Sequence, residues 1–175
     1  MIRPFEGKTP RIAASAFVSE TAYVIGDVEI GENSCVMPGA VVRGDLGKIT
    51  IGRNVAIEDN CVIHSGAPAT PPEADVSIGD NVIFGHGAVS NCRRIGNNVL
   101  IGMNATILHD VEIGNYCIIA AGCMVKEKAR IPDKAMVAGV PGEIKGQVGP
   151  QHMYWFTQSP LVYQNLAERY KRQGL

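Results

Sequence analysis

The chain has 175 residues, of which 46% are hydrophobic, and it carries a formal net charge of −1 with a pI near 6.4. This length fits one domain with a sizeable core. The near-neutral charge gives no electrostatic reason to expect nucleic acid or an anionic membrane as a partner. The opening MIRPFEGKTPRIA lacks a signal-peptide core, and no run reaches the roughly 18 apolar residues of a membrane span. We therefore expect a soluble, cytoplasmic protein.

Aliphatic residues recur at every sixth position over most of the chain. Neither a helix nor an ordinary strand has this period, whereas stacked hexapeptides form a parallel β-helix. Three hexapeptides make one triangular coil, so the repeat positions fall on three faces, which we name A, B and C. Face A has Ile12, Ile30, Ile51, Ile78, Ile95, Ile113 and Ile131. Face B has Val18, Val36, Ile57, Phe84, Ile101, Ile119 and Val137. Face C has Val24, Val42, Ile63, Ser90, Ile107 and Val125.

The step of six is broken three times, each time after face C. Three extra residues lie between Val42 and Ile51, nine lie between Ile63 and Ile78 around GAPATPPEAD, and one residue is missing between Ser90 and Ile95. Long loops in a compact domain are usually functional or disordered. Two insertions at one corner therefore single out that corner.

The repeat ends before a segment of different composition. We predict a β-helix domain over residues 1–148 and a helical segment over 149–175 packed on it. Ser159 followed by Pro160 is typical of an N-cap and first helical position. Leu161, Val162, Leu166 and Tyr170 then recur at helical spacing, which predicts an amphipathic C-terminal α-helix along the outside of the prism or across a boundary between copies.

Polar residues with chemical potential lie beside these repeat positions. Arg43, His64 and Asn91 each follow a face-C position, so we expect a column with one residue per coil, spaced by about 5 Å. On face B, Glu58 follows Ile57, and His86 lies two residues after Phe84. The column and His86 would meet only between copies, and three copies can close into a ring. The cleft would then join His64 and His86, with Arg43, Asp45 and Glu58 nearby.

The stretch from Val42 to His86 resembles the γ-class carbonic anhydrase family of hexapeptide-repeat proteins. The motifs that carry the likeness are VVRGD, EDNCVIH (58–64) and GHGAV (85–89), with IGMNATIL and VAGVPGEI further on. The resemblance implies a left-handed β-helix, a homotrimer, CO₂ and bicarbonate as small-molecule substrates, and zinc at the interfaces. It implies that His64, His86 and Asn91 occupy the metal-ligand positions and that Arg43 and Asp45 order the interface and bind bicarbonate. Tyr163 resembles a helix tyrosine that lines the site.

The chain departs from the family pattern at three positions: Asn91 stands where a third histidine is expected, Glu58 replaces a glutamine, and Ala56 replaces an asparagine found in archaeal relatives. A catalytic zinc site has three protein ligands, and a neutral amide oxygen is a poor one. We expect metal to bind weakly or not at all, unless Glu58 or His109 completes the site. A carboxylate in the set also suits harder divalent ions.

Three functions remain open. The first is a metal-dependent lyase that hydrates CO₂ reversibly, with Arg43 holding the bicarbonate. The second is a trimer without catalytic activity that serves as a scaffold or anion binder, in which Arg43 and Asp45 form only a salt bridge between copies. The third is acyl transfer or thioester hydrolysis with His86 as general base and no metal. Metal analysis separates the first from the others, and stabilisation by a coenzyme A derivative would favour the third.

Overall fold

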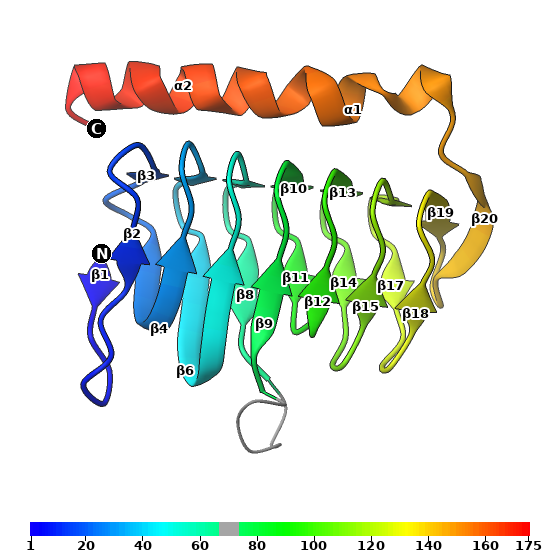
Figure 1. The fold of residues 1–175 in the computed structure, drawn as a ribbon, viewed down its shortest axis with the longest axis horizontal. Helices are drawn as coiled ribbons and strands as arrows, with labels where there is room; N and C mark the ends of the chain where they lie inside the picture. Colours follow the sequence, from blue (N-terminus) through cyan, green and yellow to red (C-terminus); the bar gives the residue numbers. More distant parts are fainter. Residues whose placement is uncertain (67–73) are drawn as a thin grey trace.

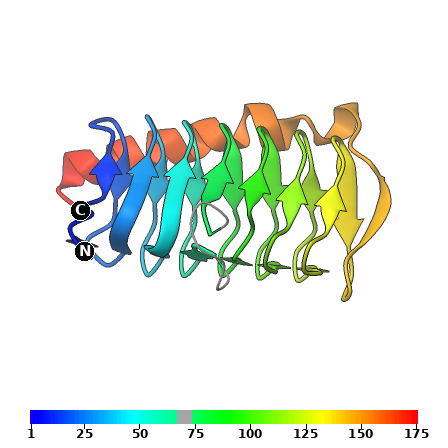
Figure 2. The same ribbon diagram turned by 60° about the horizontal axis from the view of Figure 1, so that its bottom comes forward.

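The computed structural model describes residues 1–66 and 74–175 and is a left-handed parallel β-helix of about seven turns with a C-terminal helix. The coils stack into a triangular prism, and the helix runs along its length from the last coil back to the first (Figures 1 and 2). This is the predicted fold. Most of the predicted insertion at 66–75 lies outside the described residues.

The strands of faces A and C belong to one parallel sheet, in which β4 and β6 continue around the corner between the two faces. These strands are β1 (Ile2–Arg3), β2 (Arg11–Ile12), β4 (Tyr23–Ile30), β6 (Val41–Ile51), β8 (Val62–His64), β9 (Val76–Ile78), β11 (Val89–Ser90), β12 (Arg94–Ile95), β14 (Thr106–Ile107), β15 (Glu112–Ile113), β17 (Met124–Val125) and β18 (Arg130–Ile131).

Face B forms the second sheet, and its last strand, β20, pairs antiparallel with β19 and closes the end of the prism. Its strands are β3 (Phe17–Val18), β5 (Cys35–Val36), β7 (Ala56–Ile57), β10 (Val82–Phe84), β13 (Val99–Ile101), β16 (Ile118–Ile119), β19 (Ala135–Ala138) and β20 (Glu143–Gln147). On all three faces the repeat positions pair in the predicted register, for example Ile57 with Phe84 and Ile63 with Ser90. Their side chains form the interior core.

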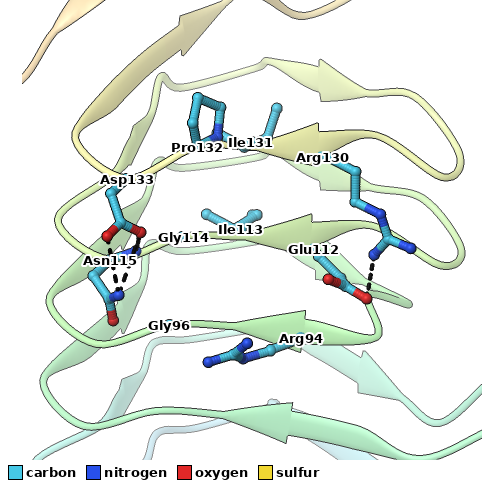
Figure 3. Close-up of a pocket in the computed structure, with 10 residues that line it drawn as sticks. All are labelled: Arg94, Gly96, Glu112, Ile113, Gly114, Asn115, Arg130, Ile131, Pro132 and Asp133. Atoms are coloured by element: carbon cyan, nitrogen blue, oxygen red, sulfur yellow. Dashed lines mark hydrogen bonds and ion pairs between the residues drawn. The ribbon is translucent and has the colours of Figure 1, made fainter.

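Alternate side chains of a strand point to opposite faces, so each prism face has one outward row. The outward row of face A is polar: Arg11, Glu29, Thr50, Ser77, Arg94, Glu112 and Arg130. A hollow of about 250 Å³ crosses this row where Glu112 pairs with Arg130 (Figure 3). The polar row is suited to solvent.

The outward row of face B is apolar and lies under the C-terminal helices η1 (Pro150–His152), α1 (Tyr154–Thr157) and α2 (Ser159–Gln173). Phe17, Cys35, Ala56 and Ile83 pack against Ala167 of α2. The prediction of a helix packed on the prism is thus confirmed. The predicted N-cap was wrong, because α2 begins at Ser159 itself, and α1 precedes it. Burial of Phe156 against Tyr116, with ring centroids 5.8 Å apart, holds this earlier turn in place.

The outward row of face C is also apolar, and no helix of the chain contacts its strands among the element contacts of the described residues. It consists of Tyr23, Val41, Val62, Val89, Thr106 and Met124. Val89 is 36% exposed. The division of the chain at residue 148 stays a prediction. Neither α1 nor α2, within the part of the chain that is described, has the length and apolar character needed to cross a membrane.

Candidate functional site

The predicted column is present at the corner between faces C and A. Arg43 pairs in register with His64, and Asn91 follows Ser90, which pairs with Ile63. The Arg43 Nη2 and Asn91 Nδ2 atoms lie 3.3 and 3.4 Å from Nδ1 of His64. Both groups are donors, so Nδ1 of His64 is the ring nitrogen that carries the lone pair.

Asp45 ties this column together. Its carboxylate accepts hydrogen bonds from Arg43 Nη1 at 2.7 Å and from His64 Nε2 at 2.9 Å. Partial burial acts to raise the pKa of Asp45, but the hydrogen bonds from Arg43 and His64 outweigh it and lower that pKa. The ionised Asp45 therefore holds the N–H of His64 on Nε2.

A second cluster occupies the corner between faces B and C. His86 lies in the turn after β10, where Gly87, with φ of 71°, permits the left-handed conformation that the turn needs. Glu58 Oε2 accepts the main-chain N–H of His86 at 3.0 Å and also lies 3.0 Å from its Nε2. Asp59 Oδ2 lies 2.7 Å from His86 Nδ1. Glu58 is only 4% exposed, whereas the His86 side chain is 47% exposed.

Tyr163 of α2 joins this second cluster. Burial, followed by a hydrogen bond with Glu58 and the charge of Glu58, raises the pKa of the Tyr163 hydroxyl. The Tyr163 hydroxyl therefore stays protonated at neutral pH. Burial also raises the pKa of Cys35, below the helix, to about 12, so its thiol is not a nucleophile at neutral pH.

The two clusters lie at opposite edges of face C. Among the described residues, no hydrogen bond or ion pair joins the column of Arg43, His64 and Asn91 to His86 or Glu58, and the His109 side chain makes no hydrogen bond to the column. Within residues 1–66 and 74–175 of one chain, no three His, Cys, Asp or Glu side chains are grouped to hold a metal ion. The polar side chains of the described residues therefore form two separate clusters, one at each edge of face C.

Sequence reasoning did not identify Asp59, although it lies two residues after Ile57, the same offset that His86 has from Phe84. The signal available was its position in the turn directly after Glu58. Ala56, the other departure from the family pattern, is buried under α2 on face B and does not reach the column. A hollow of about 390 Å³ adjoins Asp45 and is bordered by Leu46 and Phe5.

The donor groups fit a divalent cation. Imidazoles that bind metals usually donate their other ring N–H to a carboxylate. His64 does so to Asp45, and Nδ1 of His86 lies 2.7 Å from Asp59 Oδ2. Imidazole nitrogen and carboxylate oxygen are both accepted donors for first-row divalent ions.

The fold and this divided polar site define a hexapeptide-repeat β-helix protein, and residues 94–127 match the model for the bacterial transferase hexapeptide (six repeats). Gamma carbonic anhydrase 2, mitochondrial, of Arabidopsis thaliana is 34% identical over 92% of this chain, which spans 58% of that relative. Carnitine operon protein CaiE of Escherichia coli K12 is 32% identical over 94% of this chain and 82% of CaiE. The chain belongs to the hexapeptide-repeat protein family. The crystal structure of a hexapeptide transferase family protein from Anaplasma phagocytophilum has a TM-score of 0.89 and 29% identity, with 97% of both chains covered.

Proposed function

We propose that the chain forms a homotrimer with a γ-carbonic anhydrase-like site in each cleft, where it hydrates CO₂ reversibly. The observation that carries this proposal is face C: it is apolar, the main helix contacts of the described residues all lie elsewhere, and each of its edges has one of the two polar clusters. Exposed apolar patches of this kind mark interaction surfaces.

Three prisms that turn face C toward a common axis form a closed ring. Each prism then meets its neighbours through two different edges, which is a heterologous interface that closes by rotation. The edge with His86 and Glu58 would lie against the neighbour's edge with Arg43 and His64. The ring thus brings the two parts of the site together without any change in the coils.

The roles of the residues follow from their contacts. A divalent ion held by His64 and His86 would supply a bound water of lowered pKa, near 7 as known from zinc carbonic anhydrase. The Arg43 guanidinium, whose side chain is 44% exposed beside His64, would bind the bicarbonate anion. Asp45 orients both Arg43 and His64. The main-chain N–H of His86 orients the Glu58 carboxylate, and Tyr163 would line the cleft beside it.

Mixed trimers test the proposal. His64→Ala and His86→Ala trimers should each lose CO₂ hydration, since each lacks one half of every cleft. After the two variants are unfolded and refolded together in equal amounts, about one quarter of the clefts would pair an intact His64 with an intact His86. Stopped-flow hydration should then recover to about that fraction of wild type. An inactive wild-type trimer, or a mixture without recovery, would contradict the proposal.

Acyl transfer is the second candidate. It is supported by the likeness to a hexapeptide transferase family protein and by the hollow beside Asp45, which is larger than CO₂ requires. In this case His86, held by Glu58 and Asp59, would act as general base. Acetyl-coenzyme A should then raise the melting temperature of metal-free wild-type protein. The His86→Ala variant should be unable to transfer the acetyl group.

A further inference from the structure

We propose that Glu58 is the third metal ligand and replaces the imidazole that is missing at Asn91. This inference rests on the proposed trimer. The ion would be held by His64 of one copy and by His86 and Glu58 of the next. The carboxylate thus enters the site from the opposite edge of the cleft to Asn91.

The position of Glu58 beside His86 is the first argument. Glu58 Oε2 lies 3.0 Å from Nε2 of His86, and Asp59 Oδ2 lies 2.7 Å from its Nδ1. Each ring nitrogen of His86 therefore has a carboxylate oxygen beside it, and both carboxylates attract a cation. An ion at the Nε2 edge of the ring would be within reach of Glu58 as well.

The distance itself is the second argument. Ligand atoms bound at about 2.1 Å to one tetrahedral ion are separated by roughly 3.4 Å. The observed 3.0 Å between Nε2 of His86 and Oε2 of Glu58 therefore requires only a small adjustment for both to bind one ion.

The surroundings of Glu58 are the third argument. Glu58 is 4% exposed, and its carboxylate accepts the His86 main-chain N–H at 3.0 Å. A buried carboxylate oriented by a main-chain hydrogen bond is pre-organised in the manner of a metal ligand with its supporting groups. Asn91, in contrast, directs its amide nitrogen, and not an electron pair, at His64.

Two imidazoles and one carboxylate form a set found both in zinc hydrolases and in non-heme iron sites. The proposed site therefore accepts first-row divalent ions, and Zn²⁺ and Mn²⁺ are suitable probes. Mn²⁺ adds a spectroscopic readout that does not depend on catalysis.

The test is calorimetric titration of metal-free trimer with Zn²⁺ and Mn²⁺, with the paramagnetic resonance of bound Mn²⁺ as the second readout. Wild type should bind one ion per chain. Glu58→Gln, which preserves shape but removes the charge, should weaken binding roughly 100-fold. Glu112→Gln, which removes a carboxylate from face A, should leave binding unchanged. The double variant Glu58→Gln, Asn91→His should regain Zn²⁺ binding, because a third imidazole returns.

The outcomes distinguish this inference from the proposed function. Wild-type affinity in a trimeric Glu58→Gln protein overturns Glu58 as a ligand and leaves the trimeric site standing. Metal bound by Asn91→His but not by wild type also overturns the inference. Metal binding that is unaffected by His64→Ala overturns the proposed site itself. Recovery in the double variant excludes misfolding as the cause of the loss in Glu58→Gln.

Discussion

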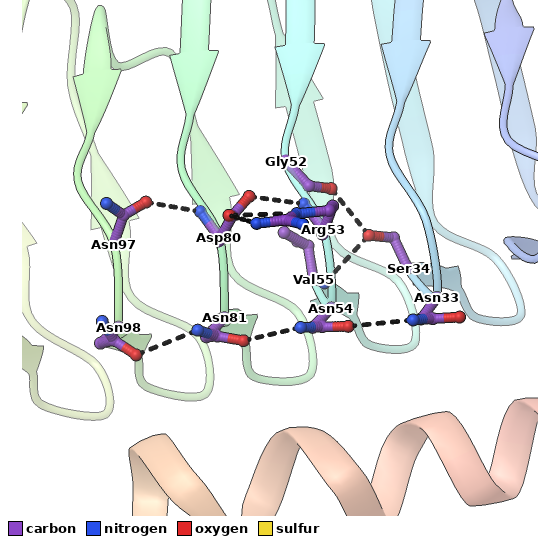
Figure 4. Close-up of polar contacts among 10 residues, drawn as sticks. All are labelled: Asn33, Ser34, Gly52, Arg53, Asn54, Val55, Asp80, Asn81, Asn97 and Asn98. Atoms are coloured by element: carbon purple, nitrogen blue, oxygen red, sulfur yellow. Dashed lines mark hydrogen bonds and ion pairs between the residues drawn. The ribbon is translucent and has the colours of Figure 1, made fainter.

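Asparagine at the corner between faces A and B shows how single residues build this prism. Four successive coils place Asn33, Asn54, Asn81 and Asn98 there, with φ between 56° and 57°. Asparagine tolerates this left-handed conformation better than most residues. The side-chain amides also form a ladder with N···O distances of 3.3, 3.0 and 3.2 Å (Figure 4). In the next coil Tyr116 keeps the conformation but packs against Phe156 instead.

A second ladder at the same corner leads to a prediction for Asp80. Asp80 Oδ1 accepts the main-chain N–H of Arg53 at 2.8 Å, as Asn97 does for Asp80 itself. Asp80→Asn keeps this acceptor, so it should cost much less than Asp80→Ala, which loses the bond and about 1 kcal/mol of stability. Urea unfolding of the two variants at pH 7 measures the difference, and equal losses would contradict it.

The same residue predicts a pH dependence. The main-chain hydrogen bond from Arg53 lowers the pKa of Asp80 below its ordinary 3.8, with a further contribution from the Arg53 side chain and opposition from burial. A lowered folded pKa stabilises the protein above the unfolded value, and this contribution is lost as the pH falls through the folded value. The stability advantage of wild type over Asp80→Asn should therefore shrink below pH 3.8. An advantage that stays constant well below pH 3.8 would contradict this assignment.

The sequence predicted those features of the candidate site that depend on the hexapeptide repeat. Strand register follows from the count of six, so the alignment of Arg43, His64 and Asn91 could be predicted from their spacing alone. The contacts of Asp59 with His86 and of Tyr163 with Glu58 could not be derived in this way, because side-chain reach at a corner and helix docking have no period. Tyr163 was found through the family resemblance alone.

The C-terminal helix differs from the strands in how it is held. Each inner strand is paired on both sides through main-chain hydrogen bonds, as β10 is with β7 and β13, whereas α2 packs through its side chains on the outward row of face B. Its existence was predicted from apolar spacing. The short helix α1 was not predicted, because Phe156 packs against Tyr116, which is far away in the sequence.

This difference predicts separate stabilities. Ala167 is 4% exposed and packs in the cluster with Phe17 and Ile83. Ala167→Glu would bury an unpaired carboxylate, which costs several kcal/mol, so the helix should detach instead. Hydrogen exchange should show lost protection over 159–173 with the strands of face A unchanged. Glu168→Gln, an exposed neighbour on the same helix, is the control. Unchanged helix protection in Ala167→Glu would contradict this account.

At the scale of the whole molecule, the three faces of the prism differ in what their outward rows present. Face A is charged, face B is covered by the helices, and face C presents Val41, Val62 and Val89 to its surroundings. Sequence reasoning predicted contact between copies from the separation of His64 and His86. The apolar row of face C supplies an independent physical reason for such contact, and it lies between the two halves of the site.

Face C therefore carries the last prediction. Val89→Asp would place a carboxylate in the centre of the proposed interface in all three copies, near the axis where the charges also repel one another. Sedimentation should show the mass fall from three chains to one, and Zn²⁺ binding should disappear with it, while the far-ultraviolet circular dichroism stays that of wild type. Ser77→Asp makes the same change on the outward row of face A and should leave the assembly intact. Because the coils pair within one chain, dissociation need not unfold them. A Val89→Asp protein that remains trimeric, or a wild type that sediments as a monomer, would show that face C does not join the copies.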